Sequence, residues 1–316
     1  MPDYEVFGRL FRSELPFPEV APAPAGAAHP PLTLRVAPPE RFPEMPAAPP
    51  IGETTVGKGA TVRLFRDASG FLLQFSDTGT FRISEKEIVW WPGSDGASEA
   101  ARVDVKGRVI PLALHLGGTL CLHAGAVMIA GSVIALTGPK RVGKSTLTAS
   151  LVAAGAEFVT DDVLALSGPP EPKAVSGFGS FRLWVDSAKQ VSLSSAYSEP
   201  GLGGKLNVRA AEPTGLLARE GVPLAAVYLL RPADPKIMET PKRQRLSERD
   251  AAVALLGSVK NGEILGGDEQ TRVFELASAC ARAVACYELA VPRDLDLLSH
   301  AAEEIFAWHS GSGDRK

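Results

Sequence analysis

Hydrophobic and polar residues follow two different patterns along the chain, and the change between them divides it into two parts. Between Thr54 and Trp91 the runs TVRLFRDASG, FLLQFSDTG and TFRISEKEIVWW are short, rich in β-branched and aromatic residues, and separated by Asp, Ser and Gly. Such runs predict antiparallel hairpins. From residue 106 onward, apolar strand-like runs alternate with segments of helical periodicity, which indicates an α/β fold.

The second part predicts a regular series of elements. Strands are expected near 122–130, 132–137 and 157–162, after an apolar stretch over 108–122, and a helix is expected over 144–154. The run LAAVYLLRP predicts a further strand, and helical periodicity continues over 249–260, 271–287 and 294–308. No internal repeat is visible.

Proline and polar residues mark the expected boundaries. Half of the 26 prolines precede residue 51, and the stretch APAPAGAAHPPLTLRVAPPERFPEMPAAPP predicts an irregular wrap or linker, because proline fixes φ and lacks an amide donor. The polar stretch PGSDGASEAARVDVKGR predicts a domain boundary. We therefore expect a β-rich domain over residues 1–105, a nucleotide-binding domain over 106–309 and a disordered tail over 310–316.

Composition and charge exclude several functional classes. The 316 residues carry a formal net charge of -3, which argues against a general nucleic-acid binder. The cysteines Cys121, Cys280 and Cys286 form no C-x-x-C pair, so neither a disulfide framework nor a zinc site is expected, and a reducing cytoplasm fits best. Neither an export signal nor an apolar run of membrane-spanning length is present, so no membrane partner is expected.

A phosphate-binding motif follows the strand-like run SVIALT. It matches G-x-x-x-x-G-K-[ST] and precedes the helix-compatible run STLTASLVAA, so a chance glycine turn is the weaker interpretation. Backbone amides and the helix amino terminus would surround the phosphates, Lys144 would reach the β- and γ-phosphates, and Ser145 would ligate Mg²⁺. The residues expected to bind the nucleotide are Gly138, Pro139, Lys140, Arg141, Val142, Gly143, Lys144, Ser145 and Thr146.

Two adjacent aspartates, Asp161 and Asp162, follow the apolar run EFVT. Successive side chains at the end of a strand point in different directions, so one carboxylate is expected to hold the metal and the other to accept a hydroxyl proton during phosphoryl transfer. The alternative is a turn-opening Asp-Asp pair. His123 lies in the β-like run CLHAGAVMIA, where a hydrogen-bonded core histidine is the common alternative to a functional one.

The spacing of His123, the phosphate loop and the segment TDD resembles HPr kinase/phosphorylase and its relatives. The resemblance covers residues 123 to 162 closely and implies the nucleotide-binding fold of the phosphoenolpyruvate carboxykinase type. It also implies ATP and Mg²⁺ as cofactors, Asp161 as the base with His123 beside it, and Asp162 near the metal. The opening Y-x-x-x-G and S-x-x-P-x-P, read from Tyr4 and Ser13, is similar to HPr-kinase-like proteins that phosphorylate a serine of lasso-peptide precursors.

Further cations are expected near the site from the same resemblance. The segments FRLWVDSAKQ and GGKLNVR bring Arg182, Lys205 and Arg209, and LAVPRDLDLL brings Arg293. Such cations would offset charge on the transferring phosphoryl group, although solvated surface cations would have the same sequence pattern. The run PKRQR at 241–245 is expected to be a solvated loop rather than a dock for an acidic peptide.

The resulting hypothesis is a cytoplasmic, ATP- and Mg²⁺-dependent kinase that phosphorylates serine on a peptide or small protein. A small-molecule hydroxyl kinase and a non-catalytic ATP-sensing module stay open as alternatives. The sequence does not specify the acceptor or the oligomeric state, and a homo-oligomer is possible.

Overall fold

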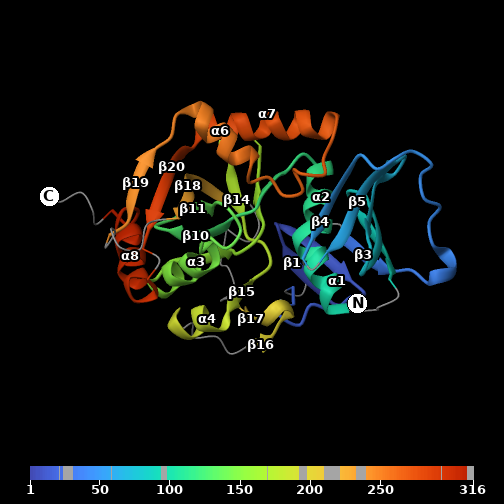
Figure 1. Cartoon of the computed structure of the whole chain (residues 1–316), viewed down its shortest axis with the longest axis horizontal. Helices are drawn as coiled ribbons and strands as arrows, with labels where there is room; N and C mark the ends of the chain where they lie inside the picture. Colours follow the sequence, from blue (N-terminus) through green and yellow to red (C-terminus); the bar gives the residue numbers. More distant parts are fainter. Residues whose placement is uncertain are drawn as a thin grey trace.

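The chain folds as a mixed α/β protein, as its alternating pattern predicts (Figure 1). The computed structural model describes residues 1–20, 22–23, 31–57, 59–93, 98–168, 170–191, 198–209, 221–232, 240–292 and 294–311. No described helix is both long and apolar enough to cross a bilayer.

The amino-terminal part forms a sheet with the strand order β1-β2-β3-β8-β7-β6-β5-β4. The predicted hairpins are present in β4 to β8, which pair antiparallel in sequence order from β4 onward. The bounds are β1 Asp3–Val6, β2 Arg9–Ser13, β3 Leu32–Val36, β4 Gly52–Val56, β5 Ala60–Asp67, β6 Gly70–Phe75, β7 Gly79–Ile83 and β8 Glu87–Pro92, with a 3₁₀ turn at Pro39–Arg41.

One strand lies inside the proline-rich stretch, where the expectation of an irregular wrap is wrong. β3 (LTLRV) pairs in parallel with β2 on one side and β8 on the other. Its side chains alternate, with Leu32 and Leu34 buried, and the prolines fall outside the strand. Alternating burial and pairing on both sides therefore outweigh the proline-rich composition of the flanks.

From Ser98 onward, a continuous helical segment occupies the sequence that the polar pattern predicts as a break. It consists of helix α1 (Ser98–Asp104), a π-helical turn at Val105–Val109 and helix α2 (Ile110–Leu116). Ala101, Val105 and Val109 recur every four residues and are fully buried, which explains why this polar sequence folds as a helix.

Buried side chains of the amino-terminal sheet and of the central sheet belong to one continuous hydrophobic cluster. The helical segment contributes its apolar face to this cluster, and Figure 1 shows it between the two sheets. The division at residue 105 stays a prediction about folding units.

The central sheet carries the phosphate loop. Its strand order is β12-β10-β11-β18-β14-β13-β9, with β20 beside β18 and β19 beside β20. β11, β18 and β20 run parallel, whereas β10 is antiparallel to β11. The strands are β9 Leu120–Leu122, β10 Gly125–Ile129, β11 Ser132–Thr137, β12 Glu157–Thr160, β13 Leu164–Leu166, β14 Lys173–Val175, β18 Val222–Pro232, β19 Lys242–Arg245 and β20 Ala285–Val291.

Helices cover both faces of this sheet. Ile134 and Leu136 of β11 pack into a cluster with helices α3 (Lys144–Ala153) and α8 (Leu295–Ala307). Val133 and Ala135 point to the opposite face, into the cluster that contains helices α6 (Glu248–Leu256) and α7 (Asp268–Ala283). The central strands are apolar on both sides because both sides are covered.

Two predicted helices are shorter than expected. α6 ends at Leu256 rather than at residue 260, and α7 ends at Ala283. Residues 285–287, which the periodicity assigned to the end of the helix, instead begin strand β20, which lies beside β18. The predicted loop at 241–245 is also wrong in part, because Lys242–Arg245 form the exposed strand β19.

A small sheet lies beside the amino-terminal end of α3. Its order is β15-β17-β16, and α4 follows β15 directly. The bounds are β15 Ser180–Trp184, α4 Val185–Val191, β16 Ser198–Pro200 and β17 Lys205–Arg209, with a 3₁₀ turn at Leu202–Gly204.

Candidate functional site

The phosphate-binding motif forms the connection between β11 and α3. Gly138 and Gly143 have φ values of 136° and 104°, which favour glycine, and Arg141 between them also has a positive φ, 67°. A Cβ on Gly138 would lie 2.8 Å from the carbonyl oxygen of Leu230 on β18. The first glycine is therefore required both by its own backbone and by the neighbouring strand.

The amino terminus of α3 is open toward the loop. Gly143 is the N-cap residue and provides no side-chain cap, so the first amides of the helix are available to an anion. The Lys144 ammonium donates to the carbonyl oxygens of Gly138 and Pro139 at 2.9 and 3.1 Å, and burial lowers its pKa to about 8. The lysine thus lies across the loop that it would use to bind phosphates.

The other loop residues have different surroundings. The Thr146 hydroxyl lies 3.2 Å from that of Ser187 on α4, so it connects α3 to α4. Lys140, Arg141 and Val142 form the loop itself together with Pro139. Gly125 of β10 permits the close packing of α3, because a Cβ there would collide with the Thr148 hydroxyl.

Asp161 lies at the end of β12 and is almost completely buried, with 7% of its surface exposed. Its Oδ2 accepts a hydrogen bond from the backbone N–H of Arg182 at 3.0 Å, and its Oδ1 is buried with no hydrogen-bond donor in the described part of the chain. Burial raises the pKa of Asp161 to about 7, although the Arg182 amide and the Ser145 hydroxyl oppose this rise. A buried carboxyl group beside the loop serine is suited to bind a cation.

Asp162 has the opposite electrostatic character. Both of its oxygens accept hydrogen bonds from the Lys260 ammonium at 2.9 Å, and Nδ1 of His123 lies 3.1 Å from Oδ1. Burial alone would raise the pKa of Asp162, but Lys260 and His123 hold it well below its ordinary value. Burial lowers the pKa of His123, and Asp162 opposes this effect.

The expected pairing of His123 with Asp161 is therefore wrong. The two carboxylates leave the strand in different directions, as alternation predicts, but His123 contacts the second one and Ser145 contacts the first. The roles of Asp161, Asp162 and His123 in phosphoryl transfer stay predictions. Their contacts show which carboxylate lies beside the loop serine and which lies beside the histidine.

Lys260 was not identified from the sequence. It lies in the connection between α6 and α7, where its backbone N–H donates to the carbonyl oxygen of Cys121 at 2.9 Å, and the His123 N–H donates to the Ser258 carbonyl at 2.6 Å. These bonds hold the connection against the segment that carries His123. Gly257, a typical residue just after a helix, could have ended the predicted helix earlier and placed Lys260 in a loop.

Arg182 and Lys205 lie on paired strands of the small sheet, and their roles in the site stay predictions. Lys205 donates to the carbonyl oxygen of Arg182 at 3.4 Å and lies over the Trp184 ring, and burial, followed by the charge of Arg182, lowers its pKa. Arg209, by contrast, donates to backbone carbonyl oxygens of Pro18 and Glu19 in the amino-terminal segment. Arg293 lies outside the described residues.

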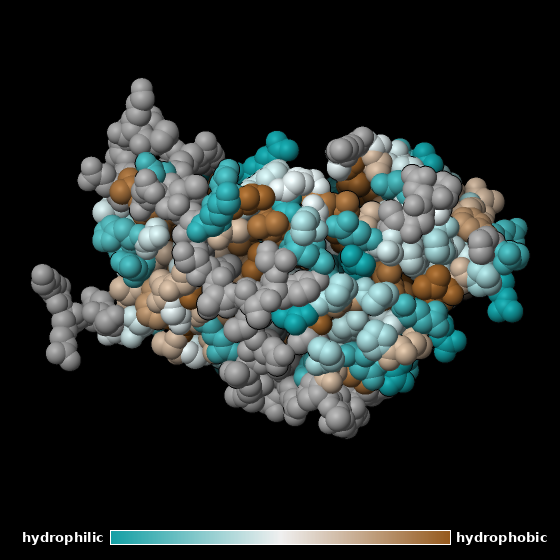
Figure 2. All heavy atoms as spheres, turned by 90° about the horizontal axis from the view of Figure 1, so that it is seen from below, coloured by the Kyte–Doolittle hydropathy of each residue, from teal (hydrophilic) through white to brown (hydrophobic). Residues whose placement is uncertain are grey.

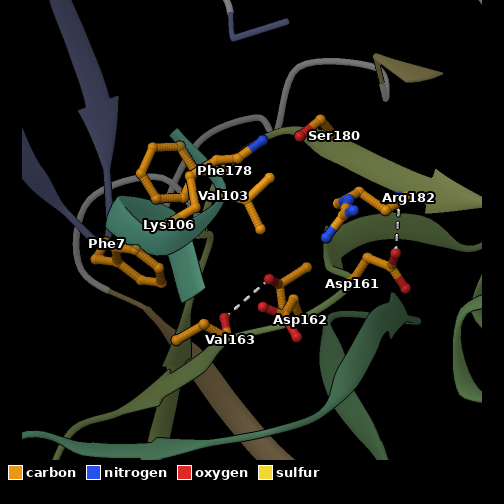
Figure 3. A pocket seen from close by; sticks show the side chains of 10 residues that line it. Phe7, Val103, Lys106, Asp161, Asp162, Val163, Phe178, Ser180 and Arg182 are labelled. Carbon is orange, nitrogen blue, oxygen red and sulfur yellow. Dashed lines mark hydrogen bonds between the residues drawn. The ribbon is translucent and has the colours of Figure 1, made fainter. Parts of the chain in front are cut away.

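A pocket of about 40 Å³ opens beside the two aspartates. Figure 3 shows Phe7, Phe178, Val103 and Lys106 grouped on one side of it and the Arg182 guanidinium pointing into it from the other. The lining residues are Phe7, Val103, Lys106, Thr160, Asp161, Asp162, Val163, Phe178, Ser180 and Arg182. Segments from the amino-terminal sheet, the helical segment and the small sheet therefore meet at the carboxylates.

The residues at the loop fit a magnesium ion better than a metal held by protein groups alone. The described residues contain no cluster of three or more His, Cys, Asp or Glu side chains that could bind a metal. Mg²⁺ commonly uses one or two carboxylates together with phosphate and water oxygens. The unpartnered Oδ1 of Asp161 beside Ser145 matches that donor set, whereas Lys260 already occupies both oxygens of Asp162.

No protein-family model matches the sequence, and a comparison with curated proteins finds no match. Among solved structures, the chain is similar to the Hpr(Ser) kinase/phosphatase from Coxiella burnetii, with 14% sequence identity and a TM-score of 0.30. The similarity covers 58% of this chain and 95% of that chain.

Proposed function

We propose that the chain is an ATP- and Mg²⁺-dependent kinase that transfers the γ-phosphate of ATP to a serine hydroxyl of a peptide or small protein. The observation that carries the proposal is the arrangement of two unlike carboxylates beside the amino terminus of α3. Asp161 adjoins the loop serine, and Asp162 lies in a cluster with His123 and Lys260. Phosphoryl transfer needs both a charged clamp on the phosphates and a group that accepts the acceptor's proton.

In this proposal the phosphates of ATP bind at the start of α3. The amides of the loop and the Lys144 ammonium contact the phosphate oxygens, which requires Lys144 to exchange its carbonyl partners for phosphate. Ser145 and Asp161 are the residues that would hold Mg²⁺, and the ion would neutralise charge on the β- and γ-phosphates. Arg182 and Lys205 add positive charge on the side of the small sheet.

Asp162 is the proposed proton acceptor. The serine oxygen forms a bond to the γ-phosphorus while the bond from that phosphorus to the bridging oxygen breaks, and the hydroxyl proton passes to Asp162. The products are phosphoserine and ADP. Lys260 and His123 keep Asp162 ionised and fix its orientation, and an aspartate is a sufficient base because the reaction depends mainly on positioning and charge stabilisation.

This assignment exchanges the roles that the sequence suggested for the two aspartates. The unpartnered oxygen of Asp161 and its contact with Ser145 support the metal role for Asp161. The ion pair between Lys260 and Asp162 opposes a second cation at Asp162. His123 keeps its predicted place next to the base, which is now the neighbouring residue.

The resemblance of the chain's opening favours a lasso-precursor-like peptide as the acceptor. The residues of that opening have structural roles. The Tyr4 hydroxyl accepts from the Phe17 N–H at 2.8 Å, the Ser13 hydroxyl donates to the Leu15 carbonyl at 2.6 Å, and Gly8 has a φ of 66°. These residues therefore shape the β1–β2 hairpin, whose tip lies at the pocket. In the structure, the hairpin is the feature that links the chain's opening to a peptide acceptor.

Mass spectrometry of serine-containing peptides tests the proposal. Incubation with ATP and Mg²⁺ is expected to add one phosphate to a peptide with a central serine and none to the same peptide with alanine in its place. Phosphorylation of a free sugar or amino acid, with no peptide modified, would support a small-molecule kinase. ATP binding without transfer to any hydroxyl would support the sensing module.

A further inference from the structure

We propose that the pocket between Phe7, Phe178 and Val103 binds an aliphatic side chain, of valine, isoleucine or leucine size, from the acceptor residue next to the phosphorylated serine. This inference rests on the proposed function, because it treats the hydroxyl acceptor as part of a peptide. It assigns acceptor specificity to a site that the amino-terminal sheet helps to build.

Three segments that are distant in sequence build the pocket. Phe7 comes from the tip of the β1–β2 hairpin, Val103 and Lys106 come from the helical segment, and Phe178 comes from the connection between β14 and β15. Asp161 and Asp162 form part of the same lining (Figure 3). A side chain in the pocket is therefore close enough to the carboxylates to belong to a residue adjacent to the reacting serine.

The hairpin tip is held in an unfavourable backbone conformation that places the Phe7 ring in the pocket. Phe7 has a φ of 53° and Gly8 a φ of 66°, which gives two successive left-handed residues in a two-residue turn. The left-handed conformation is unfavourable for phenylalanine, because its Cβ lies too close to the following carbonyl oxygen. Strain of this kind is commonly retained where it positions a functional group.

The surrounding residues fix this ring from two sides. The Phe7 N–H donates to the carbonyl oxygen of Ser176 at 2.7 Å, and its ring meets that of Phe178 edge to face at 5.8 Å between centroids. A Cβ on Gly177 would lie 3.0 Å from Cε1 of Phe7 and 2.9 Å from the Thr160 hydroxyl. The ring is therefore packed tightly against the segment that leads to β15. Asparagine would adopt the left-handed conformation of this turn more readily than phenylalanine does.

Asp162 on the pocket lining is already paired with Lys260, and Asp161 is the proposed Mg²⁺ ligand, so neither carboxylate is available to a cationic occupant. Lys106 forms an ion pair with Glu19, which is only 2% exposed, so the ammonium is neutralised by a buried partner. The Arg182 guanidinium points into the pocket, and its Nε is buried with no hydrogen-bond acceptor in the described residues. A lysine or arginine side chain would meet the positive charge of Arg182, whereas an aliphatic side chain would contact the two phenylalanine rings and Val103.

The size of the pocket limits the occupant. An ordered water needs about 10–15 Å³ of such space, so the pocket of about 40 Å³ has room for roughly three waters or one small side chain. Valine, isoleucine and leucine side chains have three or four carbon atoms. Phenylalanine and tryptophan are too large to fit unless the pocket walls move.

A heptapeptide library with a central serine tests this inference. Each position next to the serine is varied, and the rate of phosphate incorporation from MgATP is measured. A valine, isoleucine or leucine at one adjacent position is expected to be preferred over lysine and over tryptophan by at least about 10-fold, the usual range for one well-filled apolar pocket.

The substitution Val103→Trp fills the pocket from the half-buried face of α1, and Val253→Trp is its matched control on the exposed face of α6. We expect Val103→Trp to raise the KM for the leucine peptide about 10-fold or more and to abolish the preference. The control variant should behave as the wild type does, because residue 253 lies outside the pocket.

A binding measurement separates this inference from the kinase reaction. The protein is labelled with fluorophenylalanine, the signals of Phe7 and Phe178 are assigned by Phe→Leu variants, and N-acetyl-seryl-leucine amide is titrated in the presence of Mg²⁺ and a non-hydrolysable ATP analogue. Shifts of these two signals with the leucine compound, and none with N-acetyl-seryl-lysine amide, support the pocket.

The combined results distinguish the two proposals. Leucine-dependent shifts without phosphoryl transfer to any peptide would keep the pocket and overturn the kinase reaction. Transfer that shows no preference next to serine and is unaffected by Val103→Trp would overturn the pocket and keep the kinase. Neither shifts nor transfer would overturn both.

Discussion

Replacing Asp161 with asparagine should stabilise the free protein in a pH-dependent way. The amide has the same shape as the carboxyl group, so it can still accept the Arg182 N–H, but it carries no charge to bury. Burial raises the pKa of Asp161 from 3.8 to about 7, so the folded protein keeps this proton over a range in which the unfolded chain loses it. In that range the stability of the wild type falls as pH rises, relative to the asparagine variant.

The magnitude follows from the pKa values. At pH 8 the full difference, 7 − 3.8 or about 3 pH units, costs the wild type about 4 kcal/mol at 1.36 kcal/mol per unit. At pH 5 only about 1 pH unit has been crossed, and the cost is between about 1 and 2 kcal/mol. The advantage of Asp161→Asn should therefore grow by roughly 2–3 kcal/mol between pH 5 and pH 8.

Thermal unfolding without Mg²⁺ or nucleotide provides the assay. An unfolding entropy of about 2.1 cal/mol/K per residue, taken over 316 residues, converts this growth into a Tm difference of about 4 °C. Asp268→Asn, on the exposed first turn of α7, is the control and should show no such pH dependence. An Asp161→Asn variant whose Tm equals that of the wild type at both pH values would refute the conclusion that burial raises the pKa of Asp161.

Three further changes probe the same site. Lys144→Ala should abolish ATP affinity or turnover, because the mobile charge on the phosphates is lost, and calorimetry that shows unchanged affinity would contradict the loop assignment. Lys260→Met should leave Asp162 without its strongest partner, so the transfer rate should fall and the acidic limb of the pH–rate profile should move to higher pH. Lys260→Arg should restore most of the rate. A pH–rate profile that is unchanged in Lys260→Met would exclude the positioning role of Lys260. Asp161→Asn should also remove the Mg²⁺ dependence of ATP binding, and a Mg²⁺ titration in which this variant responds as the wild type does would exclude the metal role.

Local pattern predicted the strand and the helix on either side of the phosphate-binding motif well. The apolar strand before Gly138 and the helical periodicity after Lys144 are local signals, and β11 and α3 begin and end close to the predicted residues. The positive φ values at Gly138 and Gly143 show why the motif has glycine at these positions. Sequence patterns are most informative where the backbone itself imposes the residue type.

Contacts between distant segments could not be predicted in the same way. The sequence places His123 and the two aspartates in one region, but which carboxylate meets the histidine depends on how the end of β12 turns. Lys260 follows Asp162 by 98 residues and belongs to no motif. Its role depends on the tertiary hydrogen bonds that hold the connection between α6 and α7 against β9.

Misassigned elements were those in which tertiary packing outweighs composition. β3 lies between β2 and β8 despite its proline-rich flanks, and the stretch expected as a polar boundary is a helix because its apolar residues recur every four positions. The pocket combines Phe7 with Phe178, a pairing that no spacing in the sequence indicates. The acceptor side of the site was therefore the part least accessible from the sequence.

Single-turnover transfer of labelled γ-phosphate tests the central claim most directly. Wild type and Asp162→Asn are each saturated with MgATP and mixed with the central-serine peptides. The account predicts label on serine with the wild type and a rate lower by about 10²–10⁴-fold with Asp162→Asn, whose MgATP affinity is retained. Wild-type label that never reaches a serine, or a variant that transfers as fast as the wild type, would contradict it.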